Sequence, residues 1–171
     1  AFNLIGSPGS GKTTLLEATL RRLKADGTRT GVIEGDLETS RDAERIRALD
    51  IPAVQINTRG GCHLNAAQAS RAMGELPLKD IEILFIENVG NLVCPAEYDL
   101  GETAKVIVLS TTEGDDKPAK YAGVFDRASA VVIGKLDMLP HTDFSLEGAT
   151  RDLRAIRPGI AVLPLSAKTG M

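Results

Sequence analysis

Residues 6–13 read Gly6-Ser7-Pro8-Gly9-Ser10-Gly11-Lys12-Thr13, and this stretch decides the fold. Its spacing, G-x-x-x-x-G-K-[ST], lies between a strand-like run and a helical pattern, which is the context of a phosphate-binding loop. The glycines let backbone N–H groups converge on phosphates, while Lys12 supplies positive charge and Thr13 offers a hydroxyl to Mg²⁺. The motif predicts a P-loop protein in which the triphosphate contacts Gly6, Ser7, Gly9, Ser10, Gly11, Lys12, Thr13 and Thr14.

Short apolar or β-branched runs recur along the chain and alternate with helical patterns. Seven strands are expected at residues 2–5, 30–33, 53–56, 81–86, 105–109, 130–133 and 160–163. The clearest helical patterns cover residues 13–25, 41–49, 65–76 and 146–156. Such alternation predicts an α/β fold with a mostly parallel seven-stranded sheet and helices on both faces. Ligands of such sheets bind beyond the carboxyl ends of the strands.

Composition and charge exclude several classes of protein. Of 171 residues, 43% are hydrophobic and 25% are charged, with a formal net charge of −3. We expect one domain over residues 1–171. No apolar run approaches the roughly 20 residues of a membrane span, and no basic run indicates a nucleic acid or membrane partner. Because no targeting peptide is visible and P-loop domains are typically intracellular, we expect a cytoplasmic protein with reduced thiols.

Two acidic residues follow apolar runs, where P-loop proteins hold Mg²⁺. Asp36 comes after the second run and Glu87 directly after the fourth. Mg²⁺ prefers oxygen ligands, so we expect Thr13, Asp36 and Glu87 to hold it, and Lys12, Asp36 and Glu87 to be the catalytic residues. The alternative is that both carboxylates only cap strand-to-loop turns. Gly90 allows a backbone N–H to approach the γ-phosphate.

Two later segments resemble the guanine-binding motifs of GTPases. They are Gly134-Lys135-Leu136-Asp137, after the sixth run, and Ser166-Ala167-Lys168, after the last one. In that resemblance Asp137 accepts hydrogen bonds from guanine, Lys135 packs its stem over the base, and the backbone N–H of Ala167 faces the guanine oxygen. Gly134 stands where the motif has Asn, which removes about 1–3 kcal/mol of polar recognition. We expect GTP or GDP, bound through Lys135, Asp137, Ser166, Ala167 and Lys168.

Three metal-ligating side chains lie in loops at one end of the expected sheet. Cys62 and His63 follow the third run, and Cys94 follows Glu87 in the sequence. Thiolate and imidazole suit Zn²⁺, Ni²⁺ or Cu. The alternative is a buried thiol with an incidental neighbouring histidine. The other histidine, His141, lies in a turn-like segment and is expected to be exposed to solvent.

Five segments closely resemble the hydrogenase nickel-incorporation GTPase family, which is similar in fold to the signal-recognition and MinD-like class of P-loop proteins. The resemblance runs essentially end to end and is carried by residues 6–13, 34–36, 62–64, 87–95 and 112–118. It implies a slow GTPase and metallochaperone that delivers nickel, or controls its insertion, during hydrogenase maturation.

The resemblance also implies a metal site and partners. Cys62, His63 and Cys94 map onto residues that bind Ni²⁺ or Zn²⁺ at a subunit interface. The implied partners are a second copy of the chain, in a homodimer that forms with metal and nucleotide, and a hydrogenase large subunit or a partner nickel chaperone. The family often carries a Cys-rich or His-rich N-terminal segment and a final helix, and we expect both to be absent from this chain.

Three other functions remain open at this point. A urease-accessory GTPase also handles nickel, but its resemblance is poorer around Cys62-His63 and residues 113–117. A small-molecule P-loop kinase requires an Arg-rich lid, which the sequence does not display. A metal scaffold that binds nucleotide with negligible turnover is compatible with the glycine at position 134.

Overall fold

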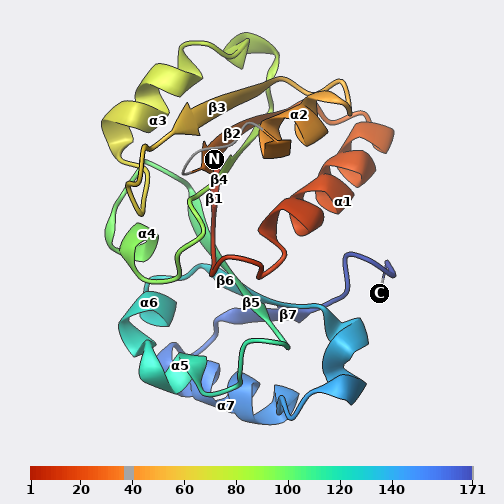
Figure 1. Ribbon diagram of the computed structural model, residues 1–171, viewed down its shortest axis with the longest axis vertical. Helices are drawn as coiled ribbons and strands as arrows, with labels where there is room; N and C mark the ends of the chain where they lie inside the picture. The colour runs from red at the N-terminus through yellow and green to blue at the C-terminus, as the bar shows by residue number, and fades with distance from the viewer. Residues whose placement is uncertain (37–40, 171) are drawn as a thin grey trace.

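The centre of the molecule is a sheet of parallel strands, and the computed structural model describes residues 1–36 and 41–170 of the chain. The strands are β1 (Phe2–Ile5), β2 (Thr30–Asp36), β3 (Ala53–Asn57), β4 (Ile83–Glu87), β5 (Ala104–Ser110), β6 (Ala130–Gly134) and β7 (Ala161–Pro164). In the described residues they form one sheet in the order β3-β2-β4-β1-β5-β6-β7, and every pairing is parallel. In Figure 1 the sheet runs from β3 near the top to β7 below the centre. The expected α/β fold with a mostly parallel seven-stranded sheet is confirmed.

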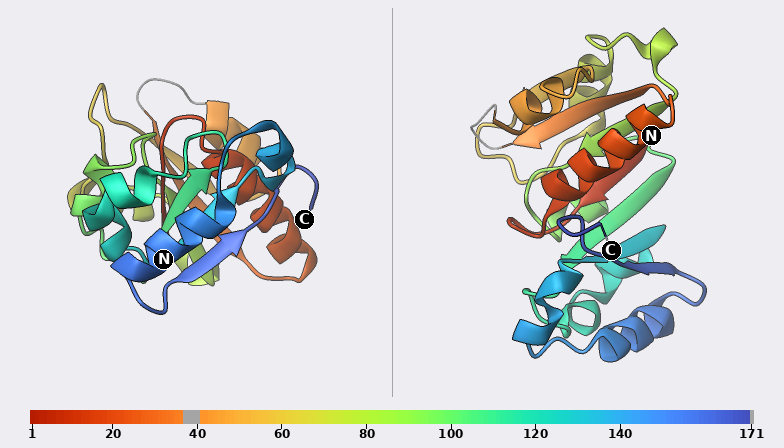
Figure 2. Two further views of the ribbon diagram at one scale, coloured as in Figure 1. Left: turned by 90° about the horizontal axis from the view of Figure 1, so that it is seen from below. Right: turned by 90° about the vertical axis from the view of Figure 1, so that its right-hand side faces the viewer.

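Helices connect the strands and cover both faces of the sheet, as the two further views in Figure 2 show. They are α1 (Lys12–Ala25), α2 (Arg41–Arg47), α3 (Ala66–Met73), α4 (Cys94–Glu97), α5 (Lys117–Lys120), α6 (Ala122–Asp126) and α7 (Leu146–Ile156). The described residues also form the 3₁₀ helices η1 (Leu78–Asp80) and η2 (Leu136–His141). Within the described ranges, no helix is long and apolar enough to cross a membrane.

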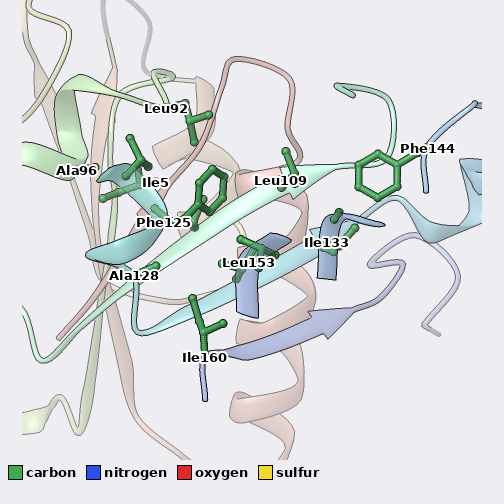
Figure 3. Close-up of a cluster of buried hydrophobic side chains, with 14 residues drawn as sticks. Ile5, Leu92, Ala96, Leu109, Phe125, Ala128, Ile133, Phe144, Leu153 and Ile160 are labelled. Carbon is green, nitrogen blue, oxygen red and sulfur yellow. The ribbon is translucent and has the colours of Figure 1, made fainter. Parts of the chain in front are cut away.

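Apolar cores lie on both sides of the sheet because successive strand residues point to opposite faces. In β1, Leu4 belongs to the cluster that contains the buried side of α1. The next residue, Ile5, belongs to the opposite cluster, which also contains Phe125 of α6 and Leu109 of β5 (Figure 3). Burial on both faces explains the nearly continuous apolar runs of the central strands.

The ends of several elements differ from the sequence prediction. β2 continues to Asp36 and β4 continues to Glu87, so these carboxylates end their strands instead of following them. Glu34 pairs in register with Glu87, which shows that the backbone ladder runs past the last apolar side chain. Helices α2 and α3 are shorter than predicted. The short helices α4, α5 and α6 were not predicted, because one turn is too short to display a 3.6-residue period.

Glu102 makes folding stability depend on pH. Burial raises the pKa of this carboxyl, but hydrogen bonds from backbone amides, Asn3 and Lys105 outweigh burial and lower the pKa from 4.5 to about 2. The Asn3 Nδ2 atom donates at 3.1 Å, the Leu100 backbone N donates at 2.7 Å, and the Lys105 Nζ atom lies 3.0 Å away. Because the folded pKa is depressed, this stabilisation is present above about pH 4.5 and is lost as the pH falls towards 2.

We therefore expect Glu102→Gln to lower the free energy of unfolding at neutral pH by more than it does near pH 3. Denaturant unfolding of both proteins at several pH values measures this difference. The exposed Glu75 provides a control, since Glu75→Gln should leave the pH dependence unchanged. A constant difference between parent and Glu102→Gln across this pH range would contradict the assignment.

Candidate functional site

The P-loop has the conformation that its sequence predicts, between β1 and α1. Gly9 and Gly11 have φ values of +74° and +99°, which side chains other than glycine rarely adopt. A Cβ atom at Gly6 would lie 2.4 Å from the Val108 carbonyl oxygen, so this position has no room for a side chain. Lys12 is 6% exposed, and its Nζ donates to the carbonyl oxygens of Gly6 at 3.0 Å and Ser7 at 3.3 Å. The loop is thus shaped around a buried cation.

A cavity of about 570 Å³ lies over the P-loop, beyond the carboxyl ends of β2 and β4. Residues of the expected phosphate and Mg²⁺ site lie along its wall, together with others: Gly9, Gly11, Lys12, Thr13, Thr14, Asp36, Arg45, Glu87, Asn88, Gly90 and Lys135. The Thr13 hydroxyl donates to Glu87 Oε1 at 2.8 Å. This hydroxyl and this buried carboxylate already face one another, and Asp36 lies on the same wall. The residues present fit the oxygen ligands that Mg²⁺ requires.

A second cavity, of about 330 Å³, adjoins the first and shares Gly11, Thr14 and Lys135 with it. Apolar side chains of Val108, Val132 and Leu165 contribute to its lining. The predicted base-binding residues Lys135, Asp137, Ser166, Ala167 and Lys168 also line it. A polar cavity continuous with a more apolar one matches the two parts of a nucleotide, its phosphates and its base.

Asp137 and Lys135 are held in place by neighbours of the same site. The Ser166 hydroxyl donates to Asp137 Oδ1 at 2.6 Å, and this hydrogen bond lowers the pKa of Asp137. Asp137 is therefore ionised at neutral pH and accepts hydrogen bonds. The Lys135 Nζ atom donates to the Gly9 carbonyl oxygen at 2.6 Å, so this side chain spans from the base cavity to the P-loop.

The metal-ligating residues come from two segments. The Cys62 Sγ atom lies 3.6 Å from His63 Nδ1, and the His63 ring stacks on Tyr98 with 3.7 Å between ring centroids. The sequence analysis placed Cys94 in a loop, and this was wrong, because Cys94 is the first residue of α4. The pKa of the Cys94 thiol is raised, mainly by a hydrogen bond with Cys62 and to a smaller extent by burial. A metal that binds this thiol must therefore displace its proton.

Within the described part of the chain, no three His, Cys, Asp or Glu side chains are arranged so that they hold a metal ion. Cys62 and Cys94 are both free thiols of intermediate burial. The three-residue metal site thus stays a prediction. The expectation for His141 is met, because this residue is exposed at the end of η2.

Several residues near these sites were not assigned from the sequence. The Lys117 Nζ atom donates to Ser7 Oγ in the P-loop at 2.9 Å and also pairs with Glu113. Asn88 is 1% exposed and accepts the backbone N–H of Leu64, next to His63, at 3.1 Å. Lys117 and Asn88 lie in segments that carry the family resemblance, which was the available signal. Tyr98 had no such signal in the sequence.

Comparisons with known proteins give a consistent result. The family model described as CobW/HypB/UreG, nucleotide-binding domain, matches residues 1–164. Hydrogenase maturation factor HypB of Escherichia coli (strain K12) is 54% identical over 169 residues, which cover 99% of this chain and 58% of that protein. The probable hydrogenase maturation factor HypB of Methanocaldococcus jannaschii is 41% identical over 99% of this chain and 76% of its own length.

Solved structures agree with the sequence relatives. The crystal structure of HypB from Helicobacter pylori in complex with nickel has a TM-score of 0.92 and 42% identity, over 98% of this chain and 78% of that one. HypB from Archaeoglobus fulgidus has a TM-score of 0.90 and 36% identity, over 99% of this chain and 82% of that one. This chain spans little more than half the length of several curated relatives that it matches. The chain belongs to the CobW/HypB/UreG nucleotide-binding domain family.

Proposed function

We propose that this chain is a slow GTPase that acts as a metallochaperone and controls nickel delivery during hydrogenase maturation. The observation that carries the proposal is a single segment with two roles. Glu87 hydrogen-bonds to Thr13 in the phosphate cavity, and Cys94 follows it seven residues later at the start of α4. Relatives named as hydrogenase maturation factors, and a similar structure solved with nickel, support this function.

The chemistry proposed for GTP hydrolysis is mainly electrostatic. Lys12 binds the β- and γ-phosphates, and the backbone N–H of Gly90 approaches the γ-phosphate. Thr13, Asp36 and Glu87 would hold Mg²⁺, which would supply positive charge against the charge that develops on the phosphates. Intrinsic hydrolysis in comparable switches is as slow as about 10⁻⁴ per second. Such a rate suits a timing device more than a metabolic catalyst.

Both segments that carry the metal ligands contact the walls of the phosphate cavity. A Cβ atom at Gly35, next to Asp36, would lie 2.8 Å from the side chain of Leu64, which follows His63. A Cβ atom at Gly90 would lie 3.2 Å from Pro8 of the P-loop. Loss of the γ-phosphate is therefore expected to move the metal ligands directly.

The metal cargo is proposed to be Ni²⁺ or Zn²⁺, bound by Cys62, His63 and Cys94 in a homodimer that forms with nucleotide. A hydrogenase large subunit or a partner nickel chaperone would receive or supply the metal. The main test is to measure bound metal and dimer fraction with GDP, with a GTP analogue and without nucleotide. Equal values in all three states would contradict a nucleotide-controlled metallochaperone.

A metal scaffold without turnover is the second candidate, because Gly134 replaces the asparagine of the guanine motif. Single-turnover release of phosphate separates the two candidates. Release at a rate above that of a Lys12→Ala variant supports the GTPase, whereas equal rates support the scaffold.

Asp137 is predicted to favour guanine over adenine, because a carboxylate accepts two guanine donors and repels an acceptor nitrogen of adenine. We expect at least about tenfold tighter binding of GDP than of ADP, which corresponds to roughly one hydrogen bond to a charged group. Asp137→Asn should lose this preference. Competition of unlabelled nucleotides against labelled GDP measures it.

Two further variants sharpen this test. The exposed Asp143 supplies a matched control, since Asp143→Asn should leave the preference for GDP over ADP unchanged. Gly134→Asn should increase the preference, because a Cβ atom at Gly134 lies no closer than 3.7 Å to its surroundings. If ATP displaces labelled GDP as well as GTP does, guanine specificity is wrong.

A further inference from the structure

We propose that Asn91 is the positioning residue that transmits the nucleotide state of the P-loop to the metal ligand Cys94. The inference rests on the proposed function and assigns its coupling to one side chain. Asn91 contacts the P-loop through its backbone and the start of α4 through its side chain.

On the nucleotide side, Asn91 forms an isolated antiparallel β-bridge with Gly6, the first residue of the P-loop. Gly6 is closely surrounded, because a Cβ atom at this position would lie 2.4 Å from the Val108 carbonyl oxygen and 2.7 Å from the Ser10 hydroxyl oxygen. The carbonyl oxygen of Gly6 accepts a hydrogen bond from the Lys12 ammonium at 3.0 Å. The backbone of Asn91 is therefore attached to the part of the P-loop that positions the phosphate-binding lysine.

On the metal side, the Asn91 side chain holds the first turn of α4. Its Oδ1 atom accepts the backbone N–H of Val93 at 2.8 Å and that of Cys94 at 3.1 Å. The first of these bonds is an Asx turn, in which a side chain replaces a backbone acceptor two residues before the donor. Helix α4 has only four residues, and its N-cap residue Val93 provides no side-chain cap. Asn91 thus fixes where the amide of Cys94 lies.

Through these two contacts, Asn91 connects the P-loop to the proposed metal ligand Cys94. The preceding residue, Gly90, packs against Pro8 and is expected to meet the γ-phosphate. When residues 90 and 91 shift with nucleotide, the acceptor of the Cys94 amide shifts with them. Without that acceptor, Cys94 takes its position from local packing alone, and its metal affinity no longer depends on nucleotide.

Asn88 has a different part in the same segment. It is buried, accepts the backbone N–H of Leu64 at 3.1 Å, and donates to Asn3 Oδ1 at 3.2 Å. Since β1 and β4 pair directly, Asn88 is tied to the sheet, whereas Asn91 is partly exposed beyond it. Asn88 is a fixed anchor for the loop of Cys62 and His63, and Asn91 is the part that follows the nucleotide.

The experiment compares Ni²⁺ affinity in GDP with Ni²⁺ affinity in a non-hydrolysable GTP analogue, by competition with a chromophoric chelator. Thiolate-to-nickel charge-transfer absorption reports whether Cys94 is a ligand. For the parent, we expect the two affinities to differ by about 5- to 150-fold, the usual range of allosteric coupling. Asn91→Ala should reduce this ratio to within about twofold of one, with nucleotide affinity unchanged. Asn91→Asp keeps the acceptor oxygen and should restore the ratio.

Asn57 supplies the matched control. Its Oδ1 atom accepts the Arg59 backbone N–H at 2.8 Å, so it forms the same kind of turn in the segment that precedes Cys62. Asn57→Ala should keep the parent ratio. Loss of the ratio in Asn57→Ala would mean that any loosened loop suffices, and a parent-like ratio in Asn91→Ala would mean that the coupling runs elsewhere. Either result overturns the role of Asn91 but leaves the proposed function standing. If the parent binds Ni²⁺ equally well with GDP and with the GTP analogue, the nucleotide coupling in the proposed function is overturned as well.

Discussion

Replacing Lys12 by alanine is expected to remove measurable triphosphate binding. Lys12 is 6% exposed, and its ammonium donates to the Gly6 and Ser7 carbonyl oxygens beside the phosphate cavity that Lys12 lines. Hydrogen bonds to charged groups contribute about 1.5–3 kcal/mol each, so losing this cation should weaken GTP binding at least about 100-fold. Titration calorimetry with GTP and Mg²⁺ measures the loss.

Two other lysines near the P-loop make this test informative. Lys117 donates to Ser7 Oγ and Lys135 donates to the Gly9 carbonyl oxygen, so neither ammonium replaces the contacts of Lys12. Lys24, at the far end of α1, provides a control, because Lys24→Ala removes a lysine from the same helix away from the cavity. Unchanged GTP affinity in Lys12→Ala would count decisively against the P-loop assignment.

The sequence predicted the parts of the fold that depend on burial along the chain. The seven strands were predicted because each carries an apolar or β-branched run of the length of a strand. Except for β1, their carboxyl ends were not. In β2, Glu34, Gly35 and Asp36 extend the strand through backbone pairing with β3, and Glu34 also pairs with β4, which the side chains do not reveal. A polar residue continues a strand where a neighbouring strand still offers backbone hydrogen bonds, as β3 does for Asp36.

The candidate site divides in the same way. The P-loop, Asp137 and Ser166 were predicted because their motifs are contiguous and imply a known conformation. The contact from Lys117 to Ser7 joins residues 110 positions apart, and no spacing in the sequence implies it. The stack of His63 on Tyr98 likewise depends on how two loops meet above the sheet. Contacts between such loops follow from tertiary structure, which the sequence pattern does not specify.

Removing the thiol of Cys94 is expected to weaken metal binding more than about 100-fold, beyond the usual effect of changing a residue that only supports a ligand. One chain offers Cys62, His63 and Cys94, so a four-coordinate ion remains short of one ligand. A second copy of the chain, related by a two-fold axis, would supply the missing ligand, since an isologous interface brings each set of ligands against its own copy. Zn²⁺ would take a tetrahedral arrangement there and Ni²⁺ a square-planar one. We therefore expect triphosphate and metal to favour the dimer together.

Linkage requires that metal shift the dimer equilibrium if dimerisation changes metal affinity. Sedimentation with a GTP analogue, with and without Ni²⁺ or Zn²⁺, should give more dimer for the parent when metal is present, and no such gain for Cys94→Ala. The exposed His141 provides the control, since His141→Ala removes an imidazole that is not one of the proposed ligands and should behave as the parent. A parent that stays monomeric with GTP analogue and metal would exclude a shared site, because no second copy would then contribute ligands. A Cys94→Ala variant with undiminished metal affinity and stoichiometry would exclude it too, because Cys94 would then not be a ligand.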